Sequence, residues 1–151
     1  MKLQFLRFAI ILLAVISFAV HSADIDHSTT ENGYEVHYNA LSTTFLTPEV
    51  SKNYQIGRSK TKGFVNISVL KQVEGKVSQP VEAEIIINAQ NFYGQNKEVT
   101  LRKISENDGA IYYIGVFSVS SREIVKFKAQ VKPQNSDAVI NIKFDQEFYT
   151  D

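Results

Sequence analysis

Apolar and polar residues alternate strictly in two neighbouring runs, Val125-Lys126-Phe127-Lys128-Ala129-Gln130-Val131 and Ile140-Asn141-Ile142-Lys143-Phe144-Asp145. A period of two is typical of β-strands that bury one face and leave the other in water. If the two runs form an antiparallel hairpin with Val131 opposite Ile140, then Lys128 lies opposite Lys143 on the outward face. The two runs therefore predict an antiparallel sheet with an apolar inner face and a charged outer face.

The same alternation recurs upstream in residues 34–39, 65–69 and 81–89, Val99 and Leu101 begin a further predicted strand, and residues 110–119 form another. Turn-forming residues such as Glu74-Gly75-Lys76 and Asn107-Asp108-Gly109 separate these runs. About seven strands in series, without an alternation of strands and helices, predict an all-β fold. We expect an antiparallel β-sandwich like that of immunoglobulin and fibronectin type III domains. A closed barrel is the alternative that the pattern leaves open.

One short helix is expected near the N-terminal end of this domain. In Thr47-Pro48-Glu49, the threonine is a typical N-cap, proline suits the first helical position, and glutamate favours the positive end of the helix dipole. Gly57 limits the helix to about three turns. Just before the helix, Phe45 and Leu46 are expected to lie in the core.

Residues 110–117 read Ala-Ile-Tyr-Tyr-Ile-Gly-Val-Phe and are apolar on both faces of the predicted strand. Such a strand is either central and covered on both sides, or it exposes one face that meets a partner. We expect a central strand.

The N-terminus carries an export signal. Lys2 and Arg7 precede an apolar run of 13 residues at positions 8–20, whereas a membrane-spanning helix needs about 20. Small residues favour cleavage after Ser22 or Ala23. We therefore expect residues 1–23 to be a cleaved signal peptide, residues 24–32 a flexible arm and residues 33–151 a single domain of a soluble periplasmic protein.

Removing residues 1–23 from the 151-residue chain leaves 128 residues with 14 Lys and Arg against 16 Asp and Glu. This mildly acidic balance disfavours nucleic acid and anionic membrane surfaces as partners, because both select a basic stripe. The chain contains no cysteine, which excludes thiol catalysis, disulfides and thiolate metal sites. No cofactor motif and no second apolar stretch occurs, so we expect no cofactor and no membrane span after cleavage.

His37 is the main candidate for catalysis. On the predicted polar face of residues 34–39 it is flanked by Glu35 and Asn39. Such a row can orient an imidazole in a small hydrolase or hold a metal weakly. Solvated strand faces carry the same residue types, so we expect a protein that is not an enzyme and has no catalytic or metal site. An enzyme that uses His37 is the alternative.

Two stretches are candidates for binding. Arg58, Lys60 and Lys62 share one face if the segment is extended, either as an anion site or as charge that protects a sheet edge. Phe92 and Tyr93 lie in a predicted turn, where aromatic side chains are often exposed and available for recognition. We expect a protein or an envelope component to bind at this turn or along residues 44–60.

Several motifs together resemble a known family. They are Tyr34-Glu-Val-His-Tyr-Asn-Ala40, Thr44-Phe-Leu-Thr-Pro-Glu-Val50, Val65-Asn-Ile-Ser-Val-Leu70 and the closing Phe144-x-Gln146-x-Phe148-Tyr149. This set is similar to the exported proteobacterial proteins grouped as domain-of-unknown-function family 4426. The resemblance covers nearly all of the chain after the signal peptide. It implies a periplasmic location in a Gram-negative bacterium and implies no activity.

The preferred hypothesis is a non-enzymatic binding module. A chaperone-like structural envelope protein is a further alternative, which would expose an unpaired apolar strand edge. The candidate binding residues are His37, Tyr38, Asn39, Thr44, Arg58, Lys60, Phe92 and Tyr93. A small-molecule site is indicated if one pocket is lined by His37, Tyr38, Asn39, Thr44, Arg58 and Asn66. If they scatter, they serve the fold.

Overall fold

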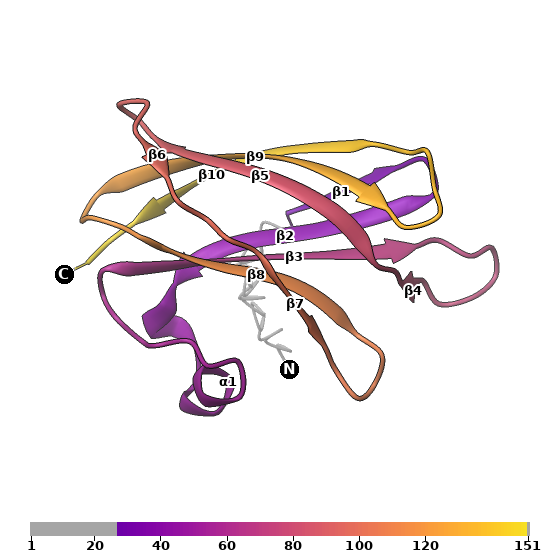
Figure 1. Cartoon of the computed structure of the whole chain (residues 1–151), viewed down its shortest axis with the longest axis horizontal. Helices are drawn as coiled ribbons and strands as arrows, with labels where there is room; N and C mark the ends of the chain where they lie inside the picture. The colour runs from indigo at the N-terminus through magenta and orange to yellow at the C-terminus, as the bar shows by residue number, and fades with distance from the viewer. Residues whose placement is uncertain (1–26, 151) are drawn as a thin grey trace, which may run out of the picture.

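A computed structural model, which describes residues 27–150, shows two antiparallel sheets packed face to face (Figure 1). The described residues form the strands β1 (Ser28–Glu31), β2 (Tyr34–Ser42), β3 (Lys62–Lys71), β4 (Gln79–Pro80), β5 (Ala83–Asn91), β6 (Asn96–Lys97), β7 (Arg102–Ser105), β8 (Ile111–Ser118), β9 (Glu123–Pro133) and β10 (Ile140–Phe148). A 3-10 helix, η1 (Thr43–Phe45), and the short helix α1 (Pro48–Asn53) connect β2 to β3.

The strand order identifies the type of sandwich. Sheet A has the order β1-β2-β3-β8-β7, with β4 paired to the end of β3, and sheet B has the order β10-β9-β5-β6. The orders β2-β3-β8-β7 and β10-β9-β5 correspond to the ABED and CFG sheets of immunoglobulin constant-type domains. The predicted immunoglobulin-like sandwich is confirmed, and the described residues form ten strands rather than about seven.

The β9–β10 hairpin has the register that the alternation predicts. Val131 lies opposite Ile140, and Lys128 lies opposite Lys143 on the other face. The inward apolar residues of both strands are buried. Register is set so firmly here because a shift by one residue would turn the whole apolar set outward.

The core between the sheets is rich in aromatic rings. Phe117 makes edge contacts with Phe127 and Phe148, and Phe127 stacks on Phe144 with ring centroids 4.7 Å apart. Each aromatic pair adds roughly 0.5–1.5 kcal/mol to the stabilisation from buried area. This core accounts for a stable fold without disulfides.

The strand that is apolar on both faces is central, as predicted. β8 lies between β3 and β7. Tyr113 and Phe117 face the core, while Ile114, only 1% exposed, faces the other way. The cover over Ile114 comes from the segment that joins β2 to β3, in a cluster with Ile56 and Phe64.

The helix begins as predicted, and the chain just before it does not follow the prediction. The Thr47 hydroxyl accepts a hydrogen bond from Val50 N at 3.2 Å, and Pro48 is the first helical residue. The expected core position of Phe45 is wrong, because Phe45 is 79% exposed. The Ser42 side chain caps η1 and turns the chain out of the strand, so the inward-outward alternation ends there.

The strand that is expected to begin at Val99 begins only at Arg102, as β7. The chain crosses here from β6 of sheet B to β7 of sheet A. Val99 and Leu101 still pack against the core. Alternate burial in this crossing segment therefore produces the same sequence pattern as a strand.

Sheet A begins earlier than the predicted domain boundary. Ser28–Glu31 pairs with β2, although residues 24–32 are expected to be a flexible arm. The predicted signal peptide and cleavage site lie outside the described residues.

Candidate functional site

A small second core lies on the outer face of sheet A, beneath residues 43–60, which we call the covering segment. Buried Ile56, Phe64 and Ile114 form its centre, and Leu46, Tyr54 and Tyr112 pack against them. In Figure 1 the helix α1 lies on the side of sheet A that faces away from sheet B. A six-residue helix is not stable by itself. This apolar contact with the sheet therefore holds it in place.

Polar contacts fix the covering segment as well. Thr43 is fully buried, and its Oγ1 donates to Ser59 O at 3.0 Å and accepts from Ser59 N at 2.9 Å. The Tyr54 hydroxyl donates to the Glu106 carboxylate, and Arg102 of β7 donates to the Tyr54 carbonyl. Thr43 and Ser59 thus join the two ends of the covering segment to each other. Tyr54 joins the middle of the segment to β7 and to the β7–β8 turn.

A mainly apolar hollow of about 210 Å³ lies between the covering segment and the sheet. Its walls are Leu46, Val50, Tyr54, Phe64, Asn66, Tyr112 and Ile114. Asn66 Oδ1 is buried and has no hydrogen-bond partner among the described residues. Leaving a buried acceptor unpaired costs about 1–3 kcal/mol. An unpaired acceptor in the wall of an apolar hollow is what a ligand with one donor group requires.

A second hollow of about 390 Å³ adjoins the first and shares Val50 and Tyr54 with it. This second hollow is more polar, because Asn53, Ser105 and Glu106 contribute to its walls. The hydrogen bond to Glu106, assisted by partial burial, raises the pKa of Tyr54 to about 12. At neutral pH the Tyr54 hydroxyl is therefore a donor, and it separates an apolar space from one that carries a carboxylate.

His37 lies on the outer face of sheet A, the same face as the apolar hollow. Its Nε2 is 3.1 Å from Glu35 Oε1, while Asn39 is exposed and pairs in register with Asn66. Neither His37 nor Glu35 lines either hollow. Within residues 27–150, no group of three His, Asp or Glu side chains is arranged to hold a metal ion.

The predicted binding residues do not gather around one pocket. Only Asn66 of the set lines the apolar hollow. Tyr38 packs inward against Phe144, and its hydroxyl lies 3.1 Å from Thr29 Oγ1. Thr44 and Arg58 serve the fold, because Arg58 Nη2 donates to Thr44 O at 2.9 Å within the covering segment.

The alternating cations reach different surroundings. Arg58 is bound within the covering segment, Lys60 is exposed, and Lys62 donates to Ser118 Oγ at 3.0 Å. Lys62 begins β3, which lies between β2 and β8. The explanation of these charges as protection of an edge strand is therefore wrong for Lys62.

The aromatic turn between β5 and β6 is exposed, as predicted. Phe92 and Tyr93 are 69% and 86% exposed. The Asn91 side chain shapes the turn by accepting from the backbone N–H groups of Tyr93 and Gln95. The ammonium of Lys126 lies 5.8 Å from the centre of the Phe92 ring, so this ring is on the outer side of sheet B.

Sequence reasoning missed the walls of the apolar hollow. Two signals were present in the chain. Val50 and Tyr54 are four residues apart, so they share one side of the helical turn. Residues 110–117 are apolar on both faces, and the outer face of such a strand needs a cover. Joining these signals would have placed the helix against the strand.

Comparisons with known proteins give a family and a fold. A family described as a domain of unknown function, DUF4426, matches residues 28–151. The chain is similar to the crystal structure of a DUF4426 family protein from Pseudomonas aeruginosa PAO1, at 30% sequence identity and a TM-score of 0.67. That match covers 82% of this chain and 94% of the other. No curated protein matches the chain. Among the described residues, no helix has the length and apolar character to cross a membrane.

Proposed function

The chain belongs to the DUF4426 family, whose description names no activity, and we propose that it is a non-enzymatic binding module. Its binding site is the apolar hollow beneath the covering segment. Its ligand is a small, mainly apolar molecule with one hydrogen-bond donor. The observation that carries this proposal is the buried, unpartnered Oδ1 of Asn66 in the wall of that hollow.

The size of the hollow limits the ligand. An apolar cavity of about 150 Å³ binds benzene in other proteins, so a hollow of about 210 Å³ has room for one or two fused rings or a short alkyl chain. Larger substituents would extend past Tyr54 into the neighbouring hollow. There the Glu106 carboxylate favours a neutral or cationic group over an anionic one.

The other two hypotheses have less support. His37 and Glu35 form a pair on the outer face of sheet A but line neither hollow, so a bound substrate has no defined position beside them. A chaperone-like role requires an apolar edge strand. The described edge strands β1, β6, β7 and β10 carry Thr, Asn, Lys, Arg, Asp and Glu on their outward faces. Residues 83–88 of β5 are also an edge, because β6 pairs only with Ala89 and Gln90. There the exposed Ile86 lies between the polar Glu84 and Asn88.

Indole and benzofuran test the proposed site, because the two molecules have nearly the same shape and only indole has an N–H donor. A nuclear magnetic resonance titration should move backbone signals of residues 46–54, 64–66 and 112–114. Indole should bind about fivefold more tightly than benzofuran, which corresponds to about 1 kcal/mol for one hydrogen bond.

Two variants sharpen the experiment. Asn66→Leu should abolish the preference for indole, and Val50→Trp should fill the hollow and abolish binding of both probes. Ser68→Ala, on the same strand and face but outside the hollow, should bind like the wild type. The absence of localised signal changes with either probe would refute the proposal.

We also place this function in the periplasm, on the basis of the N-terminal charge and apolar pattern. Cell fractionation followed by intact-mass measurement should find a periplasmic protein that begins at Ala23 or Asp24. A cytoplasmic protein of full length would contradict this location.

A further inference from the structure

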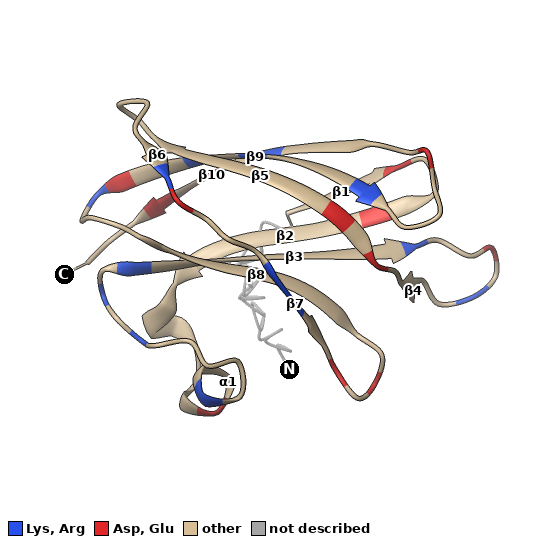
Figure 2. Ribbon diagram, in the orientation of Figure 1, with Lys and Arg blue, Asp and Glu red and all other residues tan. Residues whose placement is uncertain are grey.

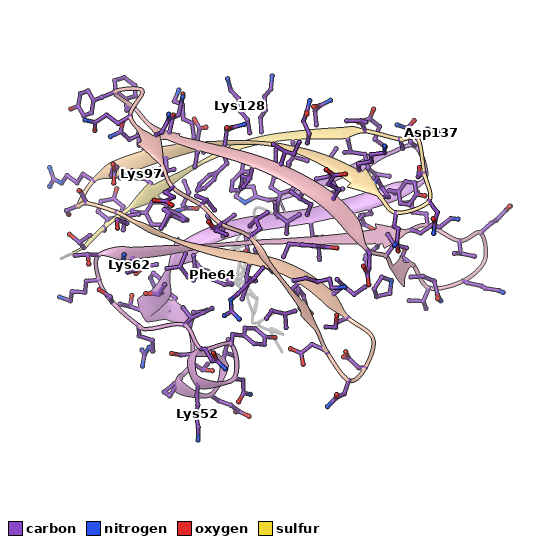
Figure 3. All side chains as sticks on the ribbon, in the orientation of Figure 1. Lys52, Lys62, Phe64, Lys97, Lys128 and Asp137 are labelled. Carbon is purple, nitrogen blue, oxygen red and sulfur yellow. The ribbon has the colours of Figure 1, made fainter. Side chains whose placement is uncertain are left out.

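The outer face of sheet B carries two lysines that face each other without an acidic partner. Lys128 of β9 lies directly opposite Lys143 of β10, and Asn88 of β5 completes the row. No carboxylate of the described residues lies within 4.0 Å of either ammonium group. Figure 3 shows Lys128 pointing away from the sandwich. Like charges opposite each other destabilise a sheet, so this row is unfavourable for folding unless an anion joins it.

The surroundings of this pair are suited to a sugar. A shallow hollow of about 340 Å³ lies over the row. Besides the two lysines, its walls include the side chains of Ile86, Asn88, Gln130 and Asn141. Amide groups donate and accept hydrogen bonds, as sugar hydroxyls require. Ile86, which is 56% exposed, provides an apolar surface for the C–H face of a ring.

We propose that this face of sheet B binds an acidic saccharide, a sugar chain with a carboxylate that bridges Lys128 and Lys143. Charge-assisted hydrogen bonds from two ammonium groups to one carboxylate are roughly twice as strong as neutral ones. The three amides position the hydroxyls of the same ring and its neighbours. This ligand removes the repulsion between the two lysines.

The aromatic turn extends the site along the strand. Phe92 follows Asn88 by four residues, which is about 13 Å in an extended strand. The contact between Lys126 and the Phe92 ring places that ring on the same outer face. Several linked sugar rings would therefore run from the lysine pair to Phe92, where an exposed aromatic ring can pack on a sugar ring.

The distribution of charge favours a saccharide over a bilayer. Asp145 lies 4.0 Å from Lys126, and Glu84 pairs in register with Lys132. Acidic residues thus flank the lysine pair on both sides, and Figure 2 shows both signs of charge on the strands of this sheet. A surface of uniform negative charge would meet these carboxylates, whereas a single carboxylate on a sugar meets only the lysine pair.

Isothermal titration calorimetry with three probes tests the proposal on the purified protein. Sialyllactose, a trisaccharide with one carboxylate, is the acidic sugar, lactose is the neutral control, and inorganic phosphate represents a free anion. We expect sialyllactose to bind at least about tenfold more tightly than either of the others. The double variant Lys128→Ala/Lys143→Ala should weaken that binding by about tenfold or more, the change that 1.4 kcal/mol produces.

Lys132→Ala is the matched control, because Lys132 lies on the same strand and the same face but opposite Glu84. It removes one positive charge, against two in the double variant, and should leave binding unchanged. Equal losses of affinity in the control and the double variant would show that overall charge alone determines binding, and would overturn the proposal. Phosphate binding as tight as that of sialyllactose would overturn the proposal in favour of a simple anion site, and the absence of binding with every probe would overturn the proposal as well.

Discussion

Thr43 is the single residue on which the closure of the covering segment depends most. Its buried Oγ1 satisfies both the N–H and the carbonyl of Ser59. Thr43→Val keeps the shape of the side chain and leaves both backbone groups unpaired. We expect the free energy of unfolding to fall by about 2–4 kcal/mol, from the cost of two unsatisfied groups.

Chemical denaturation followed by circular dichroism measures this loss. Thr44→Val is the matched control, because the half-buried hydroxyl of Thr44 pairs with the side chain of Ser42. We expect the control to lose less than about 1 kcal/mol. Equal losses in the two variants would show that the Thr43 hydroxyl has no special role.

Tyr54 should reveal its contact with Glu106 in an alkaline titration. The hydrogen bond to Glu106, with burial, raises the pKa of Tyr54 to about 12. Since the folded-state pKa is raised, the stabilisation is complete below the unfolded pKa of about 10 and is lost as the pH rises towards 12. The difference in tyrosinate absorbance between wild type and Tyr54→Phe should titrate near pH 12.

Glu106→Gln provides the control for this titration. It removes the negative charge and weakens the hydrogen bond, so the pKa of Tyr54 should move back towards 10. A wild-type difference that already titrates near pH 10 would mean that the two side chains are not in contact in solution.

At this scale the sequence predicts the face of a residue inside a strand well and fails where the chain turns. The alternation around Val131 and Ile140 places every side chain on the correct face. Phe45 was expected to be buried, and one turn of 3-10 helix exposes it. The unpaired state of Asn66 was unpredictable, since it depends on which residues of a distant segment cover the strand.

Glu123 connects two elements, the β5–β6 hairpin and the start of β9. Its carboxylate accepts from Lys97 at 2.5 Å, from Asn91 Nδ2 at 3.2 Å and from Ser120 N at 2.8 Å. Burial disfavours the charged form of Glu123. The hydrogen bonds outweigh burial, with that from Lys97 contributing most, and they hold the pKa of Glu123 below its usual value. This stabilisation is present above the unfolded pKa of about 4.3 and is lost as the pH falls through the folded pKa.

Replacing Glu123 should therefore make the protein less sensitive to acid. Glu123→Gln should lower the free energy of unfolding by about 1–3 kcal/mol at pH 7. Urea denaturation at a series of pH values should then show a smaller further loss below about pH 4 than in wild type. Asp145→Asn, an exposed residue 4.0 Å from Lys126, should change little. If the stability of Glu123→Gln depends on acid pH in the same way as that of the wild type, the contacts of Glu123 do not contribute to acid sensitivity.

Among the elements, local hairpins were predictable and crossings were not. The β9–β10 hairpin has its apolar pattern and register within one continuous stretch. The crossing at residues 98–101 depends on Gly115 of β8, where a Cβ would lie 2.7 Å from Val99. Two sheets must already be packed before that contact exists, so no local pattern reports it.

The whole molecule is a sandwich whose outer faces differ in chemistry. Sheet A is partly covered by apolar side chains around Asn66, whereas sheet B is open and carries the lysine pair. The sandwich itself was predictable, because alternation over many strands averages out local exceptions. The position of a site on each face was not, since it arises from side chains that only the folded sheets bring together.

Truncation of the N-terminus tests where the folded domain begins. A protein that begins at Asp24 keeps β1 and His27, whose ring lies 5.8 Å from Tyr38 and 5.6 Å from Phe144. A protein that begins at Gly33 loses both aromatic contacts and the pairing of β1, which should lower the free energy of unfolding by roughly 1–3 kcal/mol. It also exposes the edge of β2, so we expect concentration-dependent association in analytical ultracentrifugation. Equal stability of the two proteins would mean that residues 24–32 behave as the flexible arm that the sequence predicts, and that the sandwich is complete from Tyr34 onward.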